Sequence, residues 1–576
     1  MKVFRLLFAL GILVGVASIS ALALDREAFT ISKYDLEVRL DPAQQRLGAR
    51  GKITLRNDSP QPQKIAALQI SSSLNWRSIR AGDKPLQFVS QPFVSDIDHT
   101  GGLSEAIVTL PAEIKPKDSV ELEIGYEGVI PLDMTRLTRV GIPTDIARHT
   151  SWDQIGKSFT AVRGAGYVAW YPIATESADF SEGNSLFEVG NRWREREAGS
   201  EFKAKLTMSR DGGDRAPTII CTPSAVSSEE AGHTQQASGV CTWTALGIIA
   251  PTFAIARYRD DSKPPLMELS LEGHEAGAAT YLSAIEPATK FVTEWFGKPT
   301  APIAIADFAD PHAAPFESGT LLMVSMAGED TKLAGINLVH ELVHSAFTSL
   351  RPWVSEGLAH FAEAVYREQQ GGREAALDLI GLHRAAFLDS EKEVAAAAQK
   401  NAGQPLINSF DETYYRSKAA YVWWMLRDMI GPIALKQAIR DYRPADDTDP
   451  KYVERLIESA SKRDLSVFFD DWVYHDRGLP DFHVQSVHPW KDKKEKADKE
   501  VQMVTITVEN LGSAGAEVPF TVKCEASEIT NRLEIRAKSA ATTRIELPCA
   551  PVEIVINDGS VPESDLTNNV FRITEQ

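Results

Sequence analysis

The stretch Asn337-Leu338-Val339-His340-Glu341-Leu342-Val343-His344 decides how this chain is interpreted. It lies in a segment whose apolar periodicity predicts a helix from Leu333 to Phe347. Residues four apart share one face of a helix, so the imidazoles of His340 and His344 can bind one metal ion. Glu341 is rotated by one position, beside the water that such an ion would activate, and is the candidate general base. The segment therefore predicts a zinc-dependent hydrolytic site.

A zinc site of this kind needs a third protein ligand, and two glutamates downstream are candidates. Glu356 and Glu363 are seven residues apart in sequence. On a helix they share one face about 10 Å apart, too far for both to reach one ion. Glu356 follows Trp353-Val354-Ser355, where an antiparallel helix pair would bring it opposite the first helix. We predict one Zn²⁺ per chain bound by His340, His344 and Glu356, with Glu363 as a supporting or surface residue.

Helical patterns continue around this segment, from about Pro264 to His483. A second helix is predicted to begin near Ser355, a good N-cap residue, and to end at Gly371-Gly372. A third is predicted from Tyr415 to Gly431-Pro432. The sequence therefore indicates a mainly helical region around the motif.

The two flanks have the pattern of β-structure. Residues 31–258 contain short alternating strands separated by glycine, proline and aspartate, which is typical of a large antiparallel β domain. The charged run from Lys491 to Glu500 indicates a solvated linker. Beyond it, alternating Val504, Ile506 and Val508 indicate a small β-sandwich.

Length and charge limit the domain count and the partners. The 576 residues are too many for one compact core, so about three domains are expected. The formal net charge is -18, and no compensating basic patch is apparent. This balance argues against nucleic acid or an anionic membrane surface as a partner.

The N-terminus has the pattern of a secretory signal peptide. Lys2 and Arg5 precede an apolar run from Leu6 to Val16, and Ala21-Leu22-Ala23 follows as a cleavage-like site. A membrane anchor would need about 20 apolar residues, more than this run supplies. We expect cleavage after Ala23 and a secreted or periplasmic protein without an integral membrane segment.

The four cysteines agree with that compartment. Cys221 lies close in sequence to Cys241, and Cys524 lies close to Cys549. A zinc site of four thiolates would need tighter spacing. Two local disulfides are predicted, although cross-pairing stays an alternative.

Taken together, these motifs resemble the zinc aminopeptidases of the aminopeptidase N family, which belong to the gluzincin metallopeptidases. The segment from Tyr34 to Leu55 resembles the opening strands of that family's N-terminal β domain. Trp170-Tyr171-Pro172 resembles a turn found later in it, and Asp471-Trp472 with Gly478-Leu479-Pro480 resembles the end of its catalytic region. Ala314-Pro315-Phe316-Glu317-Ser318-Gly319 stands where the family carries Gly-Ala-Met-Glu-Asn. The elements around His340 and Glu356 match the family's metal elements.

The resemblance implies roles for two further residues. Glu317 would bind the cationic α-amino group of a peptide substrate, and Tyr415 would donate its hydroxyl to the tetrahedral oxyanion. The number of residues between Tyr415 and the next lysine differs from that in the family, so Tyr414 stays an alternative to Tyr415. If the family's spacing between the second histidine and the third ligand were kept strictly, the third ligand would be Glu363.

The predicted fold class is therefore multidomain: an antiparallel β N-terminal domain, a mainly α-helical gluzincin (thermolysin-like) catalytic domain and a C-terminal Ig-like β-sandwich. The predicted parts are a signal peptide at 1–23, the β domain at 24–260, the catalytic domain at 261–487, the linker at 488–500 and the sandwich at 501–576.

The predicted function is that of an exported zinc aminopeptidase acting on peptides with a free N-terminus. Two alternatives stay open: a zinc endopeptidase of the same fold, and a catalytically decayed binding protein that uses its β-sandwich.

Overall fold

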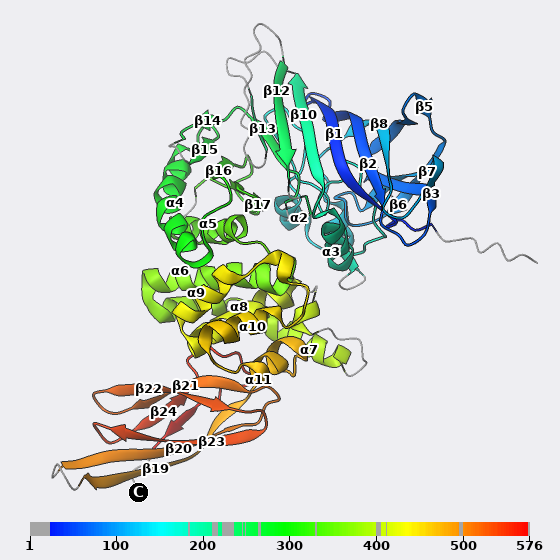
Figure 1. Cartoon of the computed structure of the whole chain (residues 1–576). Helices are drawn as coiled ribbons and strands as arrows, with labels where there is room; N and C mark the ends of the chain where they lie inside the picture. Colours follow the sequence, from blue (N-terminus) through cyan, green and yellow to red (C-terminus); the bar gives the residue numbers. More distant parts are fainter. Residues whose placement is uncertain are drawn as a thin grey trace, which may run out of the picture.

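The computed structural model describes residues 24–573 apart from gaps at 182–184, 210–216, 222–235, 245, 248, 263–265, 329–330, 399–404, 410–411 and 495–498. The signal peptide predicted at 1–23 lies outside the described residues. Figure 1 shows a β-rich N-terminal part, a mixed sheet with α4 and α5, a group of helices, and a second β part near the C-terminus.

Sheets dominate the N-terminal part, as the alternating pattern predicts. The largest has the order β12-β10-β1-β2-β8-β4-β5 and is antiparallel except where β1 pairs with β10. Tyr34, Leu36 and Val38 of β1 are buried, which confirms the predicted inward face of this strand. The strands of this sheet are β1 (Phe29–Asp41), β2 (Arg46–Asn57), β4 (Leu74–Ala81), β5 (Lys84–Pro85), β8 (Ser119–Val129), β10 (Glu201–Ser209) and β12 (Gln236–Trp243).

Among the described residues of this part there are also two smaller sheets and three helices. The sheets are β3 (Gln63–Ser71), β7 (Gly102–Ile114) and β6 (Phe88–Val94), and β11 (Thr218–Cys221), β13 (Phe253–Ala256) and β9 (Phe159–Val162). The helices are α1 (Thr135–Arg139), α2 (Thr144–Thr150) and α3 (Ser185–Glu197).

The region predicted as mainly helical also carries a five-stranded sheet of order β14-β15-β16-β18-β17. β15, β16 and β18 are parallel, and β17 joins the edge antiparallel to β18. These strands have two to four residues, too few for a clear alternating pattern. Their bounds are β14 (Arg259–Asp260), β15 (Met267–Ser270), β16 (Ala304–Asp307), β17 (Phe316–Ser318) and β18 (Leu321–Val324).

The helices around the metal motif follow the predicted order with shifted bounds. α6 begins at Pro352 and not at Ser355, because proline suits the first turn of a helix, where its missing N–H is not needed. The predicted stop at Gly371-Gly372 is confirmed, because the backbone of Gly372 is not helical (φ 81°, ψ 177°); a second helical stretch follows it to Gly381 and is included in α6. The helices are α4 (Glu275–Phe296), α5 (Thr331–Ala346), α6 (Pro352–Gly381), α7 (Arg384–Ala398), α8 (Glu412–Ile430), α9 (Pro432–Asp441), α10 (Tyr452–Ser461) and α11 (Ser466–Phe469).

α6 and α8 approach closely at Gly357. A Cβ atom placed there would lie 2.5 Å from the Ala419 Cβ and 3.0 Å from the Trp423 ring. The Trp353 and Trp423 rings stack at 5.3 Å, and Trp423 Nε1 donates a hydrogen bond to the Trp353 carbonyl (3.2 Å). The absence of a side chain at Gly357 therefore sets the distance between the two helices.

Two sheets form the C-terminal part, in the orders β19-β20-β23 and β22-β21-β24-β25. Val504, Ile506 and Val508, which alternate in the sequence, form the buried face of β20. The strands are β19 (Phe482–Lys494), β20 (Lys499–Asn510), β21 (Ala516–Lys523), β22 (Glu528–Ile535), β23 (Ser539–Leu547), β24 (Glu553–Ile556) and β25 (Val570–Arg572).

The charged run differs from the linker expected at 488–500. Lys491 pairs with Gln502 and Lys493 with Glu500, so most of the run continues the β19–β20 hairpin, and 495–498 lie outside the described residues. The apolar residues Val504, Ile506 and Val508 of β20 are buried, which favours strand pairing in this hairpin over a free tether.

Both predicted local disulfides are confirmed. Cys221 bonds Cys241 with a Cα–Cα distance of 5.9 Å, and Cys524 bonds Cys549 with a Cα–Cα distance of 6.1 Å.

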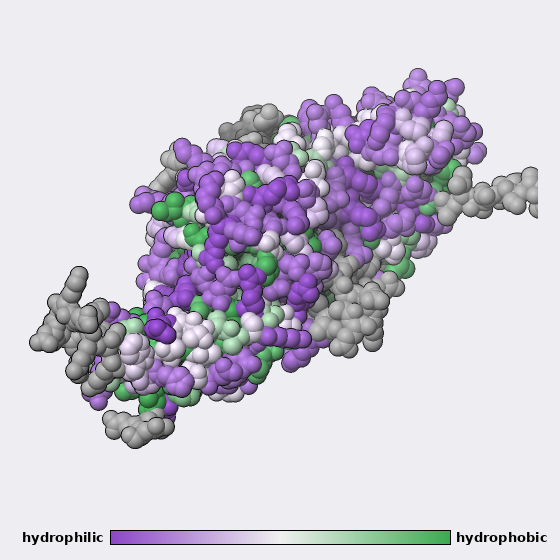
Figure 2. All heavy atoms as spheres, turned by 60° about the horizontal axis from the view of Figure 1, so that its bottom comes forward, coloured by the Kyte–Doolittle hydropathy of each residue, from purple (hydrophilic) through white to green (hydrophobic). Residues whose placement is uncertain are grey.

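The face of the molecule in Figure 2 is largely hydrophilic, with scattered apolar residues. Of the helices that the structure describes, none has the length and apolar character needed to cross a bilayer.

We expect Gly357→Ala to lower the free energy of unfolding by about 1–3 kcal/mol, because the added methyl group must push α6 and α8 apart. Urea unfolding followed by circular dichroism measures this change. Gly190→Ala in α3 is the matched control, since a Cβ atom there meets nothing within 4 Å. Equal stabilities of the two variants would contradict the close packing at Gly357.

Candidate metal centre

α5 and α6 bring His340, His344 and Glu356 together, as the sequence predicts. Glu356 Oε2 lies 3.8 Å from His340 Nε2, and Glu356 Oε1 lies 3.6 Å from His344 Nε2. The two histidines lie one turn apart on α5, and Glu356 lies in the first turns of α6, which packs against it. Two imidazole nitrogens and a carboxylate therefore surround one point.

These three residues fit a zinc ion. Ligand atoms about 2.0–2.2 Å from a tetrahedral zinc lie about 3.4 Å apart, close to the separations seen here. Glu356 Oε2 is buried and makes no hydrogen bond among the described residues. Burial alone would raise the pKa of Glu356, but His344, Arg416 and His340 lower it to about 2, so the carboxylate is ionised at neutral pH.

Arg416 of α8 also contacts Glu356. Its Nε lies 3.4 Å from Glu356 Oε2, and 41% of its side chain is exposed. Arg416 directly follows Tyr415 in sequence and is not among the predicted site residues, because no motif marks it. The guanidinium places a positive charge beside the carboxylate that would bind the metal.

Glu363 contacts the far side of the His340 ring. Its Oε1 lies 2.7 Å from His340 Nδ1, and its Oε2 lies 3.1 Å from His360 Nδ1. Burial would raise the pKa of Glu363, but the two histidines lower it well below the usual range. An ionised Glu363 accepts a hydrogen bond from the Nδ1–H of His340, which leaves the lone pair of Nε2 free to bind a metal, as outer carboxylates do at zinc sites.

His344 and His360 have further neighbours. Ser355 Oγ lies 3.4 Å from His344 Nδ1. The ring of His360 lies 4.8 Å from that of His340 and 5.2 Å from that of His383. A histidine cluster thus extends from the metal group through His360 of α6 to His383, which follows that helix.

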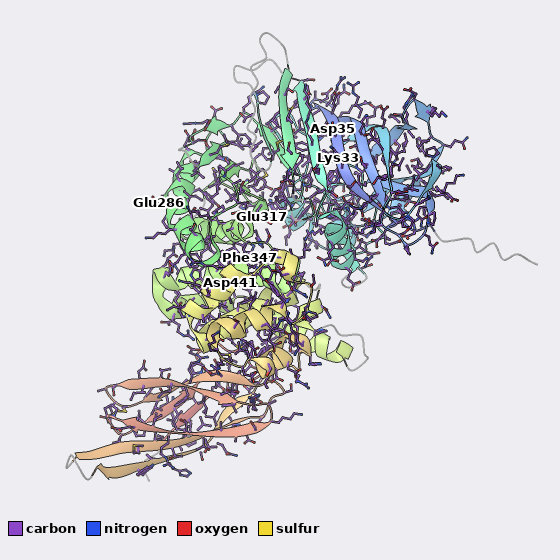
Figure 3. The ribbon with its side chains drawn as sticks, in the orientation of Figure 1. Lys33, Asp35, Glu286, Glu317, Phe347 and Asp441 are labelled. Atoms are coloured by element: carbon purple, nitrogen blue, oxygen red, sulfur yellow. A yellow bond between two sulfur atoms is a disulfide. The ribbon has the colours of Figure 1, made fainter. Side chains whose placement is uncertain are left out.

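Glu341 is buried, and the carboxyl group of Glu317 is its neighbour. Glu317 lies on β17, whose edge position beside α5 brings the residue to the motif (Figure 3). Burial and the neighbouring Glu317 raise the pKa of Glu341 well above its usual value, because two close carboxylates do not ionise together readily. The predicted base and the predicted amine-binding residue are therefore neighbours.

Tyr414 and Tyr415 lie on α8, and both are buried. Lys418 Nζ donates a hydrogen bond to Tyr414 Oη (2.8 Å) and lies 3.2 Å from Glu391 Oε2. Tyr415 is next in sequence to Arg416, which contacts Glu356. The two candidate tyrosines thus have different surroundings.

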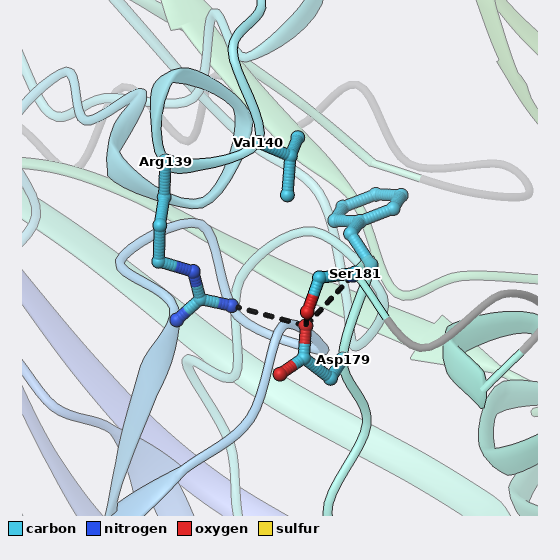
Figure 4. A pocket seen from close by; sticks show the side chains of 5 residues that line it. Arg139, Val140, Asp179 and Ser181 are labelled. Atoms are coloured by element: carbon cyan, nitrogen blue, oxygen red, sulfur yellow. Dashed lines mark hydrogen bonds and ion pairs between the residues drawn. The ribbon is translucent and has the colours of Figure 1, made fainter.

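A surface depression, shown in Figure 4, includes none of the residues of the candidate metal centre. It is lined by Arg139, Val140, Asp179, Phe180 and Ser181. Arg139 pairs with Asp96 (2.5 Å) and lies 3.6 Å from Asp179. Ser181 Oγ donates to Asp179 Oδ1 (2.7 Å). The charged groups of the depression therefore contact one another, and the histidine motif does not contribute to it.

No protein-family model matches the chain, and no curated protein matches it. Solved structures to which the chain is similar are M1 zinc metallopeptidases. One is a mutant of an M1 zinc metallopeptidase from Deinococcus radiodurans bound to a Tyr-Ser-Ala substrate, with 13% identity and a TM-score of 0.49 over 78% of this chain and 94% of that chain. Another is the M1 zinc metallopeptidase from the same organism without that mutation, with 14% identity and a TM-score of 0.46 over 75% of this chain and 90% of that chain.

Proposed function

We propose that this chain is an exported zinc-dependent aminopeptidase that removes N-terminal residues from peptides. The observation that carries the proposal is the grouping of His340, His344 and Glu356 around one point, with the carboxyl groups of Glu341 and Glu317 beside it. Export is supported by the N-terminal pattern of the sequence and by the two disulfides.

Glu341 is proposed as the general base. Zinc held by the three ligands would act as a Lewis acid toward the scissile carbonyl and the attacking water. Glu341 follows a ligand histidine on α5 and its carboxyl group is buried at the centre. The positive charges of a bound zinc ion and of a substrate ammonium group at Glu317 would lower the raised pKa of Glu341. The Glu341 carboxylate would then take a proton from the attacking water and pass it to the leaving amine nitrogen.

Glu317 is proposed to bind the α-amino group of the substrate. An ammonium group is a strong partner for a carboxylate in a buried site. Since the carboxyl groups of Glu317 and Glu341 are neighbours, an amine bound at Glu317 would place the first peptide bond of the substrate next to the base. This limits cleavage to the N-terminal residue and favours an aminopeptidase over the endopeptidase alternative.

Tyr415 is proposed as the hydroxyl donor to the oxyanion. The alternative, Tyr414, already accepts a hydrogen bond from the buried Lys418, so using its hydroxyl would disturb that contact. We also propose a domain organisation for the chain. The helical part would be a gluzincin catalytic domain with limits near residues 260 and 487, and the C-terminal sheets would form an Ig-like domain.

We expect Glu341→Gln to retain zinc but to lose about 10²- to 10⁴-fold in kcat, because an amide cannot take up the proton. Hydrolysis of aminoacyl-fluorogenic amides, with the zinc content measured on the same samples, tests this. Glu374→Gln, an exposed position on α6, is the matched control and should leave kcat unchanged. A chelator should abolish wild-type turnover; chelator-resistant turnover, or full activity of the Glu341 variant, would refute the mechanism.

We expect Glu317→Gln to lower kcat/KM for free-amine substrates by about 10- to 100-fold, since a charge-assisted hydrogen bond is lost. The measurement compares free-amine peptides with the same peptides carrying a blocked N-terminus. The wild type should cleave only the free-amine series. Cleavage of blocked peptides at a similar rate would instead identify an endopeptidase, and absence of turnover in a zinc-loaded enzyme would favour the binding protein.

A further inference from the structure

A second set of metal-binding side chains lies on the other side of the His340 ring. His340, His360 and Glu363 have ligand atoms within 4.8 Å of one another, as do His340, His344 and Glu356. The side chains of His340, His360 and Glu363 are 17%, 13% and 14% exposed. Both sets offer two imidazoles and one carboxylate, and these donors suit Zn²⁺.

His340 belongs to both sets through different ring nitrogens. Its Nε2 lies 3.8 Å from Glu356, and its Nδ1 lies 2.7 Å from Glu363. A neutral imidazole has one acceptor nitrogen, and the other carries the proton. His340 can therefore offer a lone pair to only one set at a time, and an ion in one set excludes an ion from the other.

We propose that His340, His360 and Glu363 form a second, alternative metal position that takes Zn²⁺ when the set with His344 and Glu356 is incomplete. The two positions compete for His340, so the chain holds one ion and not two. This inference concerns metal binding and does not require the peptidase activity proposed above.

The rearrangement needed to fill the second position is small. The proton of His360 moves from Nδ1 to Nε2, which is buried and makes no hydrogen bond among the described residues. The proton of His340 moves to Nε2, where it faces Glu356 Oε2, an oxygen that also makes no hydrogen bond there. Neither move breaks a hydrogen bond at the new ring position, but the N–H at His360 Nε2 gains no acceptor there, which adds to the cost of filling the second position.

The first position is nevertheless preferred in the intact chain. An ion in the second position replaces the two contacts of Glu363 with His340 and His360, at 2.7 and 3.1 Å. In the first position the histidine–carboxylate separations are 3.6 and 3.8 Å, beyond hydrogen-bond distance, so less is lost on binding. An ion in the second position would also take the His340 lone pair away from the side of Glu356, so a chain loaded there would carry metal without activity.

The test is metal binding by full-length His344→Gln, stripped with a chelator and reloaded with Zn²⁺ or Co²⁺. We expect this variant to retain about one equivalent per chain in the second position. Adding His360→Gln to the same chain should weaken binding by at least about tenfold. The single variant His360→Gln should keep its equivalent in the first position.

Glu356→Gln is a second route to the same result if His344→Gln does not fold, as judged by circular dichroism. Folded variants of both kinds without metal would overturn the proposal. It would also be overturned if His344→Gln bound metal equally well with and without His360. Absence of zinc from the wild type would count against the proposed peptidase function instead, so the two failures are distinguishable.

Discussion

The close packing of α6 between α5 and α8 is the constraint on which the candidate centre depends. Glu356 reaches His340 and His344 because α6 lies against α5, and Arg416 reaches Glu356 because α8 lies against α6. Gly357, the next residue after Glu356, has no side chain to separate the helices. A shift of α6 would move Glu356 and Glu363 together and disturb both faces of the His340 ring.

Carboxyl groups are concentrated around this packing, and each needs a compensating partner. Glu356 and Glu363 are partly buried beside histidines that lower their pKa values, whereas burial and the neighbouring Glu317 favour the neutral form of Glu341. Burying several negative charges without partners would be costly. A divalent cation beside Glu356 would offset part of that charge, which agrees with the donor set found there.

Ion pairs and hydrogen bonds join the C-terminal sheets to the helices that carry the centre. Arg373 of α6 pairs with Asp428 of α8 (2.6 Å) and with Asp558 (2.7 Å). Asp428 also pairs with Arg532 of β22 (3.2 Å). Trp472 Nε1 donates to the Gly515 carbonyl (2.8 Å). The C-terminal sheets therefore contact the same two helices that position Glu356 and Arg416.

Local patterns in the sequence determined the parts of this protein that depend on near neighbours along the chain. The four-residue spacing of His340 and His344, the helix around them and the inward face of β1 follow from helical and strand periodicity. Tertiary structure decided the contacts between segments: Glu356 lies near both histidines while Glu363 lies behind His340, and Glu317 meets Glu341 across β17 and α5. Those contacts depend on how helices and a sheet edge pack, and periodicity within one segment does not encode the distance to another.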